Sequence, residues 1–363
     1  MSDVIFAPVS NKPTPEIIKK LIKKEDYLDD VEKGDYVGIK LHVGEYGNRS
    51  HIKPEIVKVI VDELKRRGAK PFLFDCNSLY RGMRWNGLDH IRNASMNGFT
   101  TEAIGAPFIV GDGIRGMDEM DIGMKDYTQS ARVGKIIEDI DYLFVLSHYK
   151  FHELFGYAGA IKNIGMGMAS RRGKLFLHSD IRPDVIASKC VGCSACMITC
   201  PSKAITIKHD IAQLNKDACI GCGVCIVTCK FGAIEFEWTN NWESIIKTLH
   251  YTKAITDNIG KCTYLNVLTD ITPHCDCYGY TKGFVVPDIG FTFSKDIVSI
   301  DAASADLIEK AEPLEDVIWK RKELAAKDKV KALLDIDIDM NEFFSKAESI
   351  GLGSKKYNLK EIK

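Results

Sequence analysis

Short apolar runs alternate with helical patterns along the first half of the chain. Four of these runs are typical of buried β-strands: 36–43, 71–75, 106–110 and 142–147. Between the first two, residues 54–67 carry apolar side chains at helical spacing, with a proline at the start and Gly68 beyond the end. A strand, a helix and a strand in this order form a right-handed crossover in a parallel sheet. The pattern therefore predicts an α/β fold.

The same alternation returns in the last third of the chain. The expected elements are a helix at 242–258, strands at 262–268 and 284–286, and a helix at 301–312. The Lys-rich tail from Trp319 predicts peripheral helices. We expect one α/β domain, a mostly parallel sheet with helices on both faces, built from residues 1–181 and 238–363. Residues 182–237 would be inserted into it, and three domains in sequence are the alternative.

Two cysteine runs occupy the predicted insert. The first contains Cys190, Cys193, Cys196 and Cys200, and the second contains Cys219, Cys222, Cys225 and Cys229. Each run has the spacing C-x2-C-x2-C-x3-C, which in two-cluster ferredoxins gives three thiolates to one [4Fe–4S] cluster and the fourth to the other. The residues after each run also match, because Ala204-Ile205 corresponds to Ala233-Ile234. The repeat indicates an internal duplication of the ferredoxin type.

Crossed ligation gives every cysteine of the two runs a role. Cluster one would take Cys190, Cys193, Cys196 and Cys229, and cluster two would take Cys219, Cys222, Cys225 and Cys200. Zinc is the alternative metal, because pairs of C-x2-C also suit a tetrahedral ion. Two such pairs for each zinc ion would leave the third and fourth cysteine of each run without a role. The spacing therefore predicts iron–sulfur clusters, whose chemistry is electron transfer.

Composition limits the classes of partner and the compartment. With 49 lysines and arginines against 50 acidic residues, the net charge is −1, which argues against general binding to nucleic acid or to a membrane surface. No apolar stretch reaches the roughly 18 residues of a membrane span. The N-terminus lacks the basic, apolar and small-residue pattern of a signal peptide. Because cluster ligands must stay thiolates, we expect a cytoplasmic protein of a reducing, anaerobic cell.

A second group of polar residues follows the predicted strand at 142–147. His148, Lys150 and His152 alternate along the chain, so an extended backbone would place them on one face. In an open α/β sheet, ligands bind beyond the carboxyl ends of the strands. One hypothesis is therefore an anion or ligand site with imidazoles available to a metal. The other hypothesis is a polar loop whose histidines cap neighbouring backbone groups.

Two further features add candidate residues to this edge of the sheet. A glycine-rich stretch, 156–173, carries Lys162 and Asn163 and could form backbone N–H nests for phosphate or carboxylate. Cys275 and Cys277, in a His-Cys-Asp-Cys segment after a strand, could chelate a soft metal, form a redox dithiol or approach a cluster. Packed thiols without a reaction are the alternative. We expect these residues and the histidines to converge on one cleft that takes a small acidic ligand or a metal.

In this order, the motifs resemble the family catalogued as domain of unknown function 362, in its ferredoxin-containing subgroup. The resemblance rests on segments 37–42, 75–80, 147–152, 158–166, 170–174, 274–277 and 286–290. It covers most of the chain up to about Asp306. One departure is Phe151, where such proteins usually carry a glycine between the lysine and the second histidine. The resemblance implies the α/β fold and two [4Fe–4S] clusters, and it implies no reaction.

Three classes of function fit these features. The first is an oxidoreductase whose α/β domain binds a small acidic substrate or a metal centre, with the clusters supplying single electrons. The second is a non-catalytic electron carrier that docks on a larger redox complex. The third is a maturation or reactivation factor that delivers a metal or reduces a partner's cofactor. In each class we expect low-potential electron transfer with a redox protein as partner.

Overall fold

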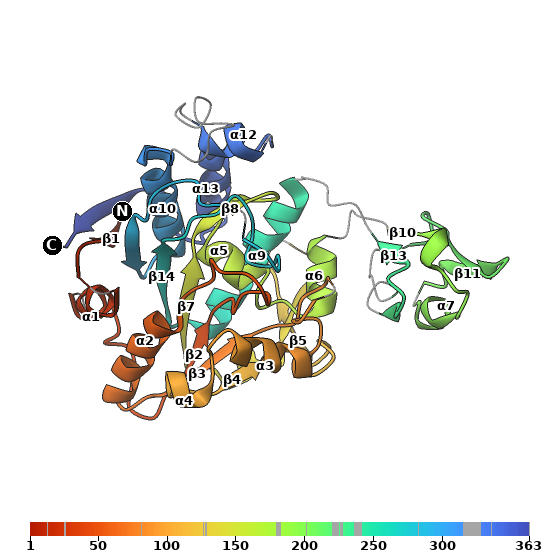
Figure 1. Cartoon of the computed structure of the whole chain (residues 1–363), viewed down its shortest axis with the longest axis horizontal. Coiled ribbons are helices and arrows are strands. Elements are labelled where there is room, and N and C mark those ends of the chain that lie inside the picture. Colours follow the sequence, from red (N-terminus) through yellow and green to blue (C-terminus); the bar gives the residue numbers. More distant parts are fainter. Residues whose placement is uncertain are drawn as a thin grey trace.

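The computed structural model describes most of the chain (Figure 1). The described residues are 1–363 without 13, 25–26, 81, 126, 128, 179–182, 201, 220–224, 226–227, 236–241, 282, 315–327, 335 and 363. Cys222 of the second cysteine run therefore lies outside the described residues. Within them, the predicted alternation of strands and helices is present.

A central sheet of eight strands runs through the described part of the chain. Its strands are β1 (Ser2–Pro8), β2 (Tyr36–Lys40), β3 (Lys70–Asp75), β4 (Phe108–Val110), β7 (Tyr142–His148), β14 (Cys262–Leu268), β15 (Gly290–Ser294) and β16 (Tyr357–Glu361). Their order is β16-β1-β15-β14-β7-β2-β3-β4. In this sheet only β15 runs antiparallel to its neighbours. The prediction of a mostly parallel sheet is therefore confirmed.

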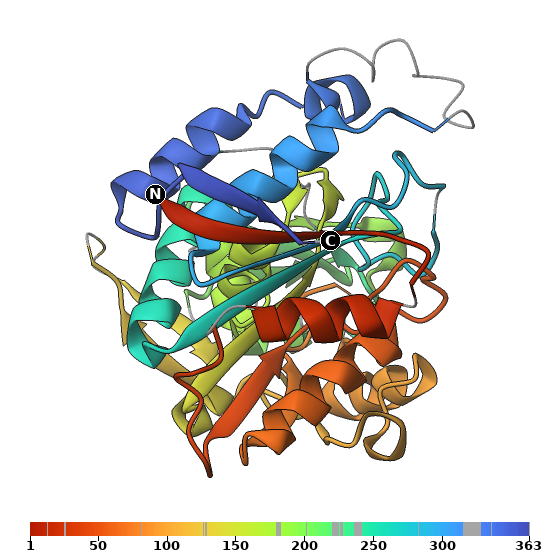
Figure 2. The same ribbon diagram turned by 90° about the vertical axis from the view of Figure 1, so that its left-hand side faces the viewer.

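Helices cover both faces of this sheet. One face holds α1 (Thr14–Lys24) and α2 (Pro54–Arg66), whose apolar residues share a buried cluster with the strands. The other face holds α5 (Ala160–Gly165), α9 (Trp242–Ile259), α10 (Ile297–Lys310) and α13 (Met340–Ser349). Figure 2 shows α1 and α2 on one side of the strands and α10 and α13 on the other. The predicted α/β class, with helices on both faces, is confirmed.

Shorter elements connect these layers. The helical ones are α3 (Gly87–Met96), α4 (Thr101–Ile104), a 3₁₀ helix at Lys135–Asp139, α6 (Arg171–Leu177) and α12 (Lys329–Leu334). Two hairpins are β5 (Glu119–Gly123) with β6 (Ser130–Gly134) and β8 (Lys150–His152) with β9 (Gly156–Ala158). Among the described helices, none combines the length and the apolar character that a membrane span requires.

Some local expectations differ from the structure. Residues 284–286 bend instead of forming a strand, and the next strand is β15. Helix α10 begins earlier than predicted, at Ile297, because the Asp296 carboxylate accepts hydrogen bonds from the amides of Val298 and Ser299. The edge strand β16 has mostly exposed residues, so no apolar run predicts it. The peripheral helices predicted for the tail correspond to α12 and α13.

The cysteine-rich segment has its own small core. Strands β10 (Asp184–Val185) and β13 (Ile234–Glu235) pair antiparallel and bring the two ends of the segment together. Between them lie a 3₁₀ helix (Ala187–Lys189), α7 (Ala195–Thr199), and a hairpin of β11 (Ile205–Lys208) and β12 (Ile211–Leu214).

The described part of this segment is separate from the central sheet in its packing. Its buried residues form a hydrophobic cluster of their own, and its strands form only small two-stranded sheets (Figure 1). The central sheet takes strands from both sides of the segment. The boundaries predicted at 182 and 237 lie outside the described residues, so the division into domains stays a prediction.

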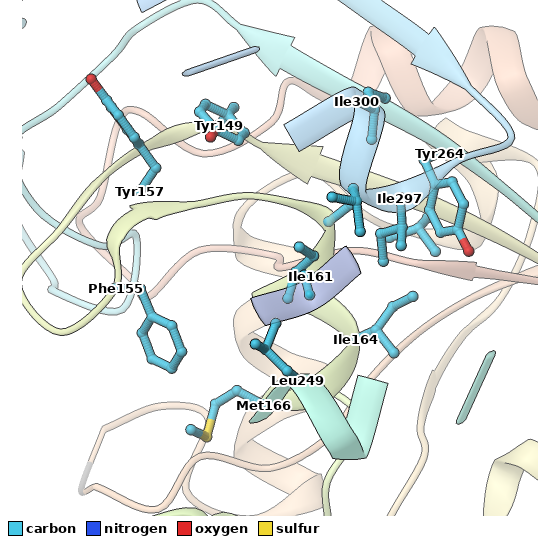
Figure 3. Packing of buried hydrophobic residues seen from close by; sticks show 14 of the residues in the cluster. Tyr149, Phe155, Tyr157, Ile161, Ile164, Met166, Leu249, Tyr264, Ile297 and Ile300 are labelled. Carbon is cyan, nitrogen blue, oxygen red and sulfur yellow. The ribbon is translucent and has the colours of Figure 1, made fainter. Parts of the chain in front are cut away.

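Helix α5 lies in the layer formed by α9 and α10. Its residues Ile161 and Ile164 belong to the same buried cluster as Leu249 of α9 and Ile300 of α10 (Figure 3). The helix also contacts strand β7. Because α5 has only six residues, its position depends on these tertiary contacts rather than on intrinsic helix stability.

Replacing Asp301 with alanine should lower the free energy of unfolding by about 2–3 kcal/mol. The buried Asp301 carboxylate accepts hydrogen bonds from the amides of Ala160, at 2.9 Å, and Ile161, at 3.0 Å. It also accepts one from the side-chain amide of Asn266, at 2.8 Å. Without it, the first amides of α5 lose their partner. Urea unfolding followed by far-UV circular dichroism measures the effect.

Asp257→Ala is the control for this experiment. Asp257 forms an exposed ion pair with Lys253 of the same helix, α9. Its replacement should change the free energy of unfolding by less than about 0.5 kcal/mol. Equal losses in the two variants would contradict the capping role of Asp301.

Candidate functional site

A cavity of about 510 Å³ lies at the carboxyl ends of three neighbouring strands. Lys40 ends β2, Asp75 ends β3 and His148 ends β7, and all three line the cavity. Ligands of open α/β sheets bind at this edge. The cavity is also lined by all of the residues that the sequence marks as candidates: His148, Lys150, His152, Lys162, Asn163, Cys275 and Cys277. The structure brings these residues together, and a catalytic role for them stays a prediction.

Asp276 ties the His-Cys-Asp-Cys segment to strands β7 and β8. Its Oδ2 atom lies 2.8 Å from His148 Nδ1 and 2.8 Å from Lys150 Nζ. Its Oδ1 atom accepts a hydrogen bond from Ser50 Oγ at 2.9 Å. Burial would raise the pKa of Asp276, but His148 and Lys150 hold that pKa well below its usual range. Asp276 therefore stays charged and, with His148 and Lys150, forms what we call the Asp276 clamp.

The Asp276 clamp bears on the hypothesis that the His148 imidazole is available to a metal. Its Nε2 atom lies 3.0 Å from the carbonyl oxygen of Thr269, and its Nδ1 atom faces the carboxylate. Both partners are oxygen atoms, so each ring nitrogen of His148 already lies within hydrogen-bonding distance of a group of the protein. Lys150 Nζ also donates to the carbonyl of His148, at 3.0 Å. The alternative hypothesis, polar residues that cap neighbouring groups, describes both side chains.

The two thiols of this segment differ in their surroundings. Cys275 is 4% exposed, and Cys277 donates its S–H to the Cys275 sulfur. This hydrogen bond lowers the pKa of Cys275 well below its usual range. Burial acts in the opposite direction and raises this pKa, whereas Lys162 and His152 also lower it. The same bond and burial raise the pKa of Cys277 well above its usual range. Of the two sulfurs, Cys275 is therefore the one that loses its proton more readily.

Lys162 and His152 complete the surroundings of the Cys275 thiolate. Lys162 Nζ lies 3.8 Å from Cys275 Sγ. Burial would lower the pKa of Lys162, but the neighbouring Cys275 sulfur outweighs burial and raises it. His152 Nδ1 accepts a hydrogen bond from the Leu154 amide at 3.0 Å, so a neutral ring carries its proton on Nε2. The hydrogen bond between His152 and Cys275 therefore comes from Nε2.

The glycine-rich stretch 156–173 has a different role from the predicted anion nest. The first amides of α5 donate to Asp301 rather than to a ligand. A Cβ atom at Gly159 would collide with this carboxylate, and one at Gly167 would lie 2.7 Å from Lys40 Nζ. The two glycines therefore allow buried ionic groups to approach the backbone.

A second cavity lies in the cysteine-rich segment, between the first run and the end of the second. Four cysteines line it: Cys190, Cys193, Cys196 and Cys229. The rest of its wall is mostly apolar. Backbone amides face two of the sulfurs, because Ala212 N lies 3.4 Å from Cys190 Sγ and Ala233 N lies 3.3 Å from Cys229 Sγ. The four cysteines are those that crossed ligation assigns to cluster one.

The cysteines predicted for cluster two are described in part. Within the described residues, Cys200, Cys219 and Cys225 form no disulfide, and Cys222 lies outside these residues. Cys200 Sγ accepts a hydrogen bond from the Ala204 amide at 3.2 Å. Within the described part of the chain, no group of three or more histidine, cysteine, aspartate or glutamate side chains is arranged to hold a metal ion.

Comparison with known proteins identifies the family of this chain. Residues 37–306 match the family described as "Domain of unknown function (DUF362)". The chain belongs to the DUF362 family. The family predicted from the motifs is therefore confirmed, and its ferredoxin-containing subgroup stays a prediction. No curated protein matches the sequence.

Two solved structures are similar to the DUF362 chain. The lactate racemase apoprotein from Thermoanaerobacterium thermosaccharolyticum is 14% identical, with a TM-score of 0.43, over 74% of this chain and 51% of that one. A protein from Thermotoga maritima is 15% identical, with a TM-score of 0.40, over 71% of this chain and 52% of that one. The DUF362 chain therefore spans about half the length of each.

The sequence did not reveal an ionic network in the wall of the larger cavity. Lys40 is fully buried and lies 2.9 Å from Asp75 Oδ1 and 2.7 Å from Asn163 Oδ1. Arg84 lies 3.3 Å from Asp75 Oδ2 and 3.5 Å from Glu45 Oε2. Burial would raise the pKa of Asp75, but Lys40 and other neighbouring cations hold it below its usual range. The one sequence signal of this network was Lys40, a charged residue at the end of an apolar strand. Arg84 and Glu45 lie in loops, where charged residues are common.

The larger cavity of the DUF362 chain thus combines unlike chemical groups. The sulfurs of Cys275 and Cys277 lie in its wall, and buried ion pairs hold the elements around them. A thiolate beside a cation is a nucleophile at neutral pH. The cavity is therefore suited to thiol chemistry on a small molecule.

Proposed function

We propose that this DUF362 chain is an iron–sulfur electron-transfer protein with two [4Fe–4S] clusters in a ferredoxin-like insert, residues 182–237. It would pass low-potential electrons between a redox protein partner and the cavity of the α/β domain. The observation that carries the proposal is the small cavity shared by Cys190, Cys193, Cys196 and Cys229. Three of these cysteines come from one run and the fourth comes from the other, as in two-cluster ferredoxins.

The residues around this small cavity fit an iron–sulfur cluster. Thiolates are the usual ligands, and amide donors to their sulfurs stabilise the charge and adjust the potential. Ala212 and Ala233 supply such donors. Left-handed backbone at Gly192, with φ of 64°, and at Ser194, with φ of 61°, curls the first run around the cavity. When bound, a [4Fe–4S] cluster accepts and releases one electron at a time.

One observation favours an oxidoreductase over a carrier without a reaction of its own. The α/β domain holds a cavity of about 510 Å³ with Cys275 and Cys277 in its wall, and a carrier has no use for such a site. A maturation factor would present its thiols at the surface, whereas Cys275 is 4% exposed. The cavity therefore supports a small-molecule substrate.

Protein purified without oxygen should hold about eight irons and about eight acid-labile sulfides per chain, because two cubane clusters contain this number. Colorimetric iron and sulfide analysis, with electron paramagnetic resonance of the reduced protein, measures the content. Cys262→Ala, at a cysteine outside both runs, should keep the full content and serves as the control. Stoichiometric zinc with little iron would overturn the proposal.

A further inference from the structure

The pair Cys275 and Cys277 has the parts of a thiol–disulfide exchange site. Cys275 and Cys277 are hydrogen-bond partners, and Lys162 Nζ lies 3.8 Å from the Cys275 sulfur. Both cysteines line the cavity of about 510 Å³, together with Tyr278, which is 37% exposed. Because part of its wall is exposed, the cavity reaches the surface. Exchange requires a nucleophilic sulfur, a second thiol within reach and access for a disulfide.

The turn that carries the pair is fixed on both sides. The Tyr278 amide donates to the Cys275 carbonyl at 3.2 Å, and the Glu45 amide donates to the Asp276 carbonyl at 2.9 Å. The Asp276 side chain is held in the Asp276 clamp and does not line the cavity, whereas Cys275 and Cys277 do. The clamp therefore keeps both sulfurs on the cavity side of the turn.

We propose that Cys275 and Cys277 form a dithiol that reduces small anionic disulfides inside this cavity. Cys275 is the nucleophile, and Cys277 is the thiol that resolves the mixed disulfide. This activity is separate from the electron transfer proposed for the cysteine-rich segment. A single turnover of the dithiol does not require that electron transfer.

The exchange balances as follows in bonds and electrons. The Cys275 thiolate attacks one sulfur of the substrate, which forms a mixed disulfide and releases the first thiolate. Cys277 gives its proton to that thiolate and attacks the Cys275 sulfur, which forms the Cys275–Cys277 disulfide and releases the second thiolate. Two electrons pass from the dithiol to the substrate. A reductant that returns two electrons is needed only for a second turnover.

The charge of Lys162, in the wall of the cavity, favours an anionic substrate. Lys162 faces the thiolate in the resting site. Once Cys275 is part of a mixed disulfide, its negative charge is lost, and Lys162 loses the anionic neighbour that raises its pKa most. An ammonium in the wall of a cavity is stabilised by a nearby anion, so a carboxylate on the bound molecule would take the place of the thiolate beside it. The chemical class is therefore a small disulfide that carries carboxylates.

A single-turnover reaction of the full chain with dithiobis(nitrobenzoate) tests the proposal. This reagent is a small disulfide with two carboxylates, and the thiolate that it releases is coloured. The wild type should release about two thiolates per chain in a fast phase, and mass spectrometry should then find Cys275 joined to Cys277. Cys277→Ser should release about one and keep the reagent on Cys275. Cys275→Ser should slow the fast phase about 100-fold.

The double variant Cys275→Ser, Cys277→Ser gives the background from every other cysteine, and circular dichroism checks that each variant is folded. A fast phase that survives in Cys275→Ser would overturn the proposal, and so would a wild type without a Cys275–Cys277 disulfide. Iron is measured in the same samples. Full thiol exchange without iron would contradict only the proposed function, and full iron without exchange would contradict only the dithiol.

The pH profile of the fast phase tests Lys162 as a positioning residue. The other titratable or charged groups that face the two sulfurs are His42, Tyr80, Arg84, His152, Glu153 and Tyr278. A depressed thiol pKa keeps the thiolate present above that pKa, so the wild-type rate should stay level from about pH 8 to about pH 6. In Lys162→Met the rate should fall towards pH 6, because the variant loses one of the groups that lower the pKa of Cys275. Identical profiles would remove Lys162 from the site.

Discussion

Replacing Cys229 with alanine should remove about four of about eight irons and free the cysteines of the other run. Cys229 ends the second run, yet it lines one cavity with Cys190, Cys193 and Cys196. If these four hold one cluster, loss of Cys229 leaves its three partners without metal. Iron analysis gives the amount lost. Alkylation of the folded protein, followed by peptide mass spectrometry, identifies which cysteines have become reactive.

The reciprocal variant sharpens this experiment. Cys200→Ala should lose a similar amount of iron, but it should free Cys219, Cys222 and Cys225 instead. Cys262→Ala lies outside both runs and should lose none. If Cys229→Ala frees the cysteines of its own run, ligation is not crossed, and the two clusters would have to be assigned run by run.

Continuous apolar runs predicted the strands at the centre of the sheet. In β7 every residue is buried, because the strand has neighbours on both edges and helices on both faces. The same reasoning failed at residues 284–286, where Val285 and Val286 are buried but their backbone forms no strand. An apolar run indicates that its residues are buried, but it does not show that they form a strand. Residues 284–286 belong to a loop. The exposed edge strand β16 shows the converse, since it pairs with β1 without an apolar run.

The gathering of candidate residues around one cavity was predictable, because parallel strands end at the same edge of a sheet. Which of these residues form hydrogen bonds or ion pairs with one another was not predictable from the sequence. Asp276 lies 128 residues from its partner His148 in the sequence. Asp301 lies 141 residues from Ala160, whose amide donates a hydrogen bond to it. Local pattern carries no information on such partners, since tertiary packing alone decides which groups meet. The sequence therefore identified the chemical groups at this edge of the sheet. It did not predict which of them form hydrogen bonds and ion pairs with one another.

Asp276→Asn should lower the free energy of unfolding by about 3–5 kcal/mol, the usual effect of removing one partner from a buried charge pair. Asp276 is fully buried, and its carboxylate lies 2.8 Å from both His148 and Lys150. Asparagine keeps the shape and removes the charge, so the buried Lys150 ammonium loses its counter-charge. Urea unfolding at neutral pH, followed by far-UV circular dichroism, measures the loss.

Asp270→Asn is the matched control. Asp270 pairs with Lys53 at 3.0 Å, but both side chains are partly exposed, so its replacement should cost less than about 1 kcal/mol. Equal stability of the two variants would mean that the charges of the Asp276 clamp are compensated elsewhere. The folded fraction of Asp276→Asn should also react more slowly with dithiobis(nitrobenzoate), because the clamp holds Cys275 and Cys277 on the cavity side. The same carboxylate would then stabilise the fold and position the thiols.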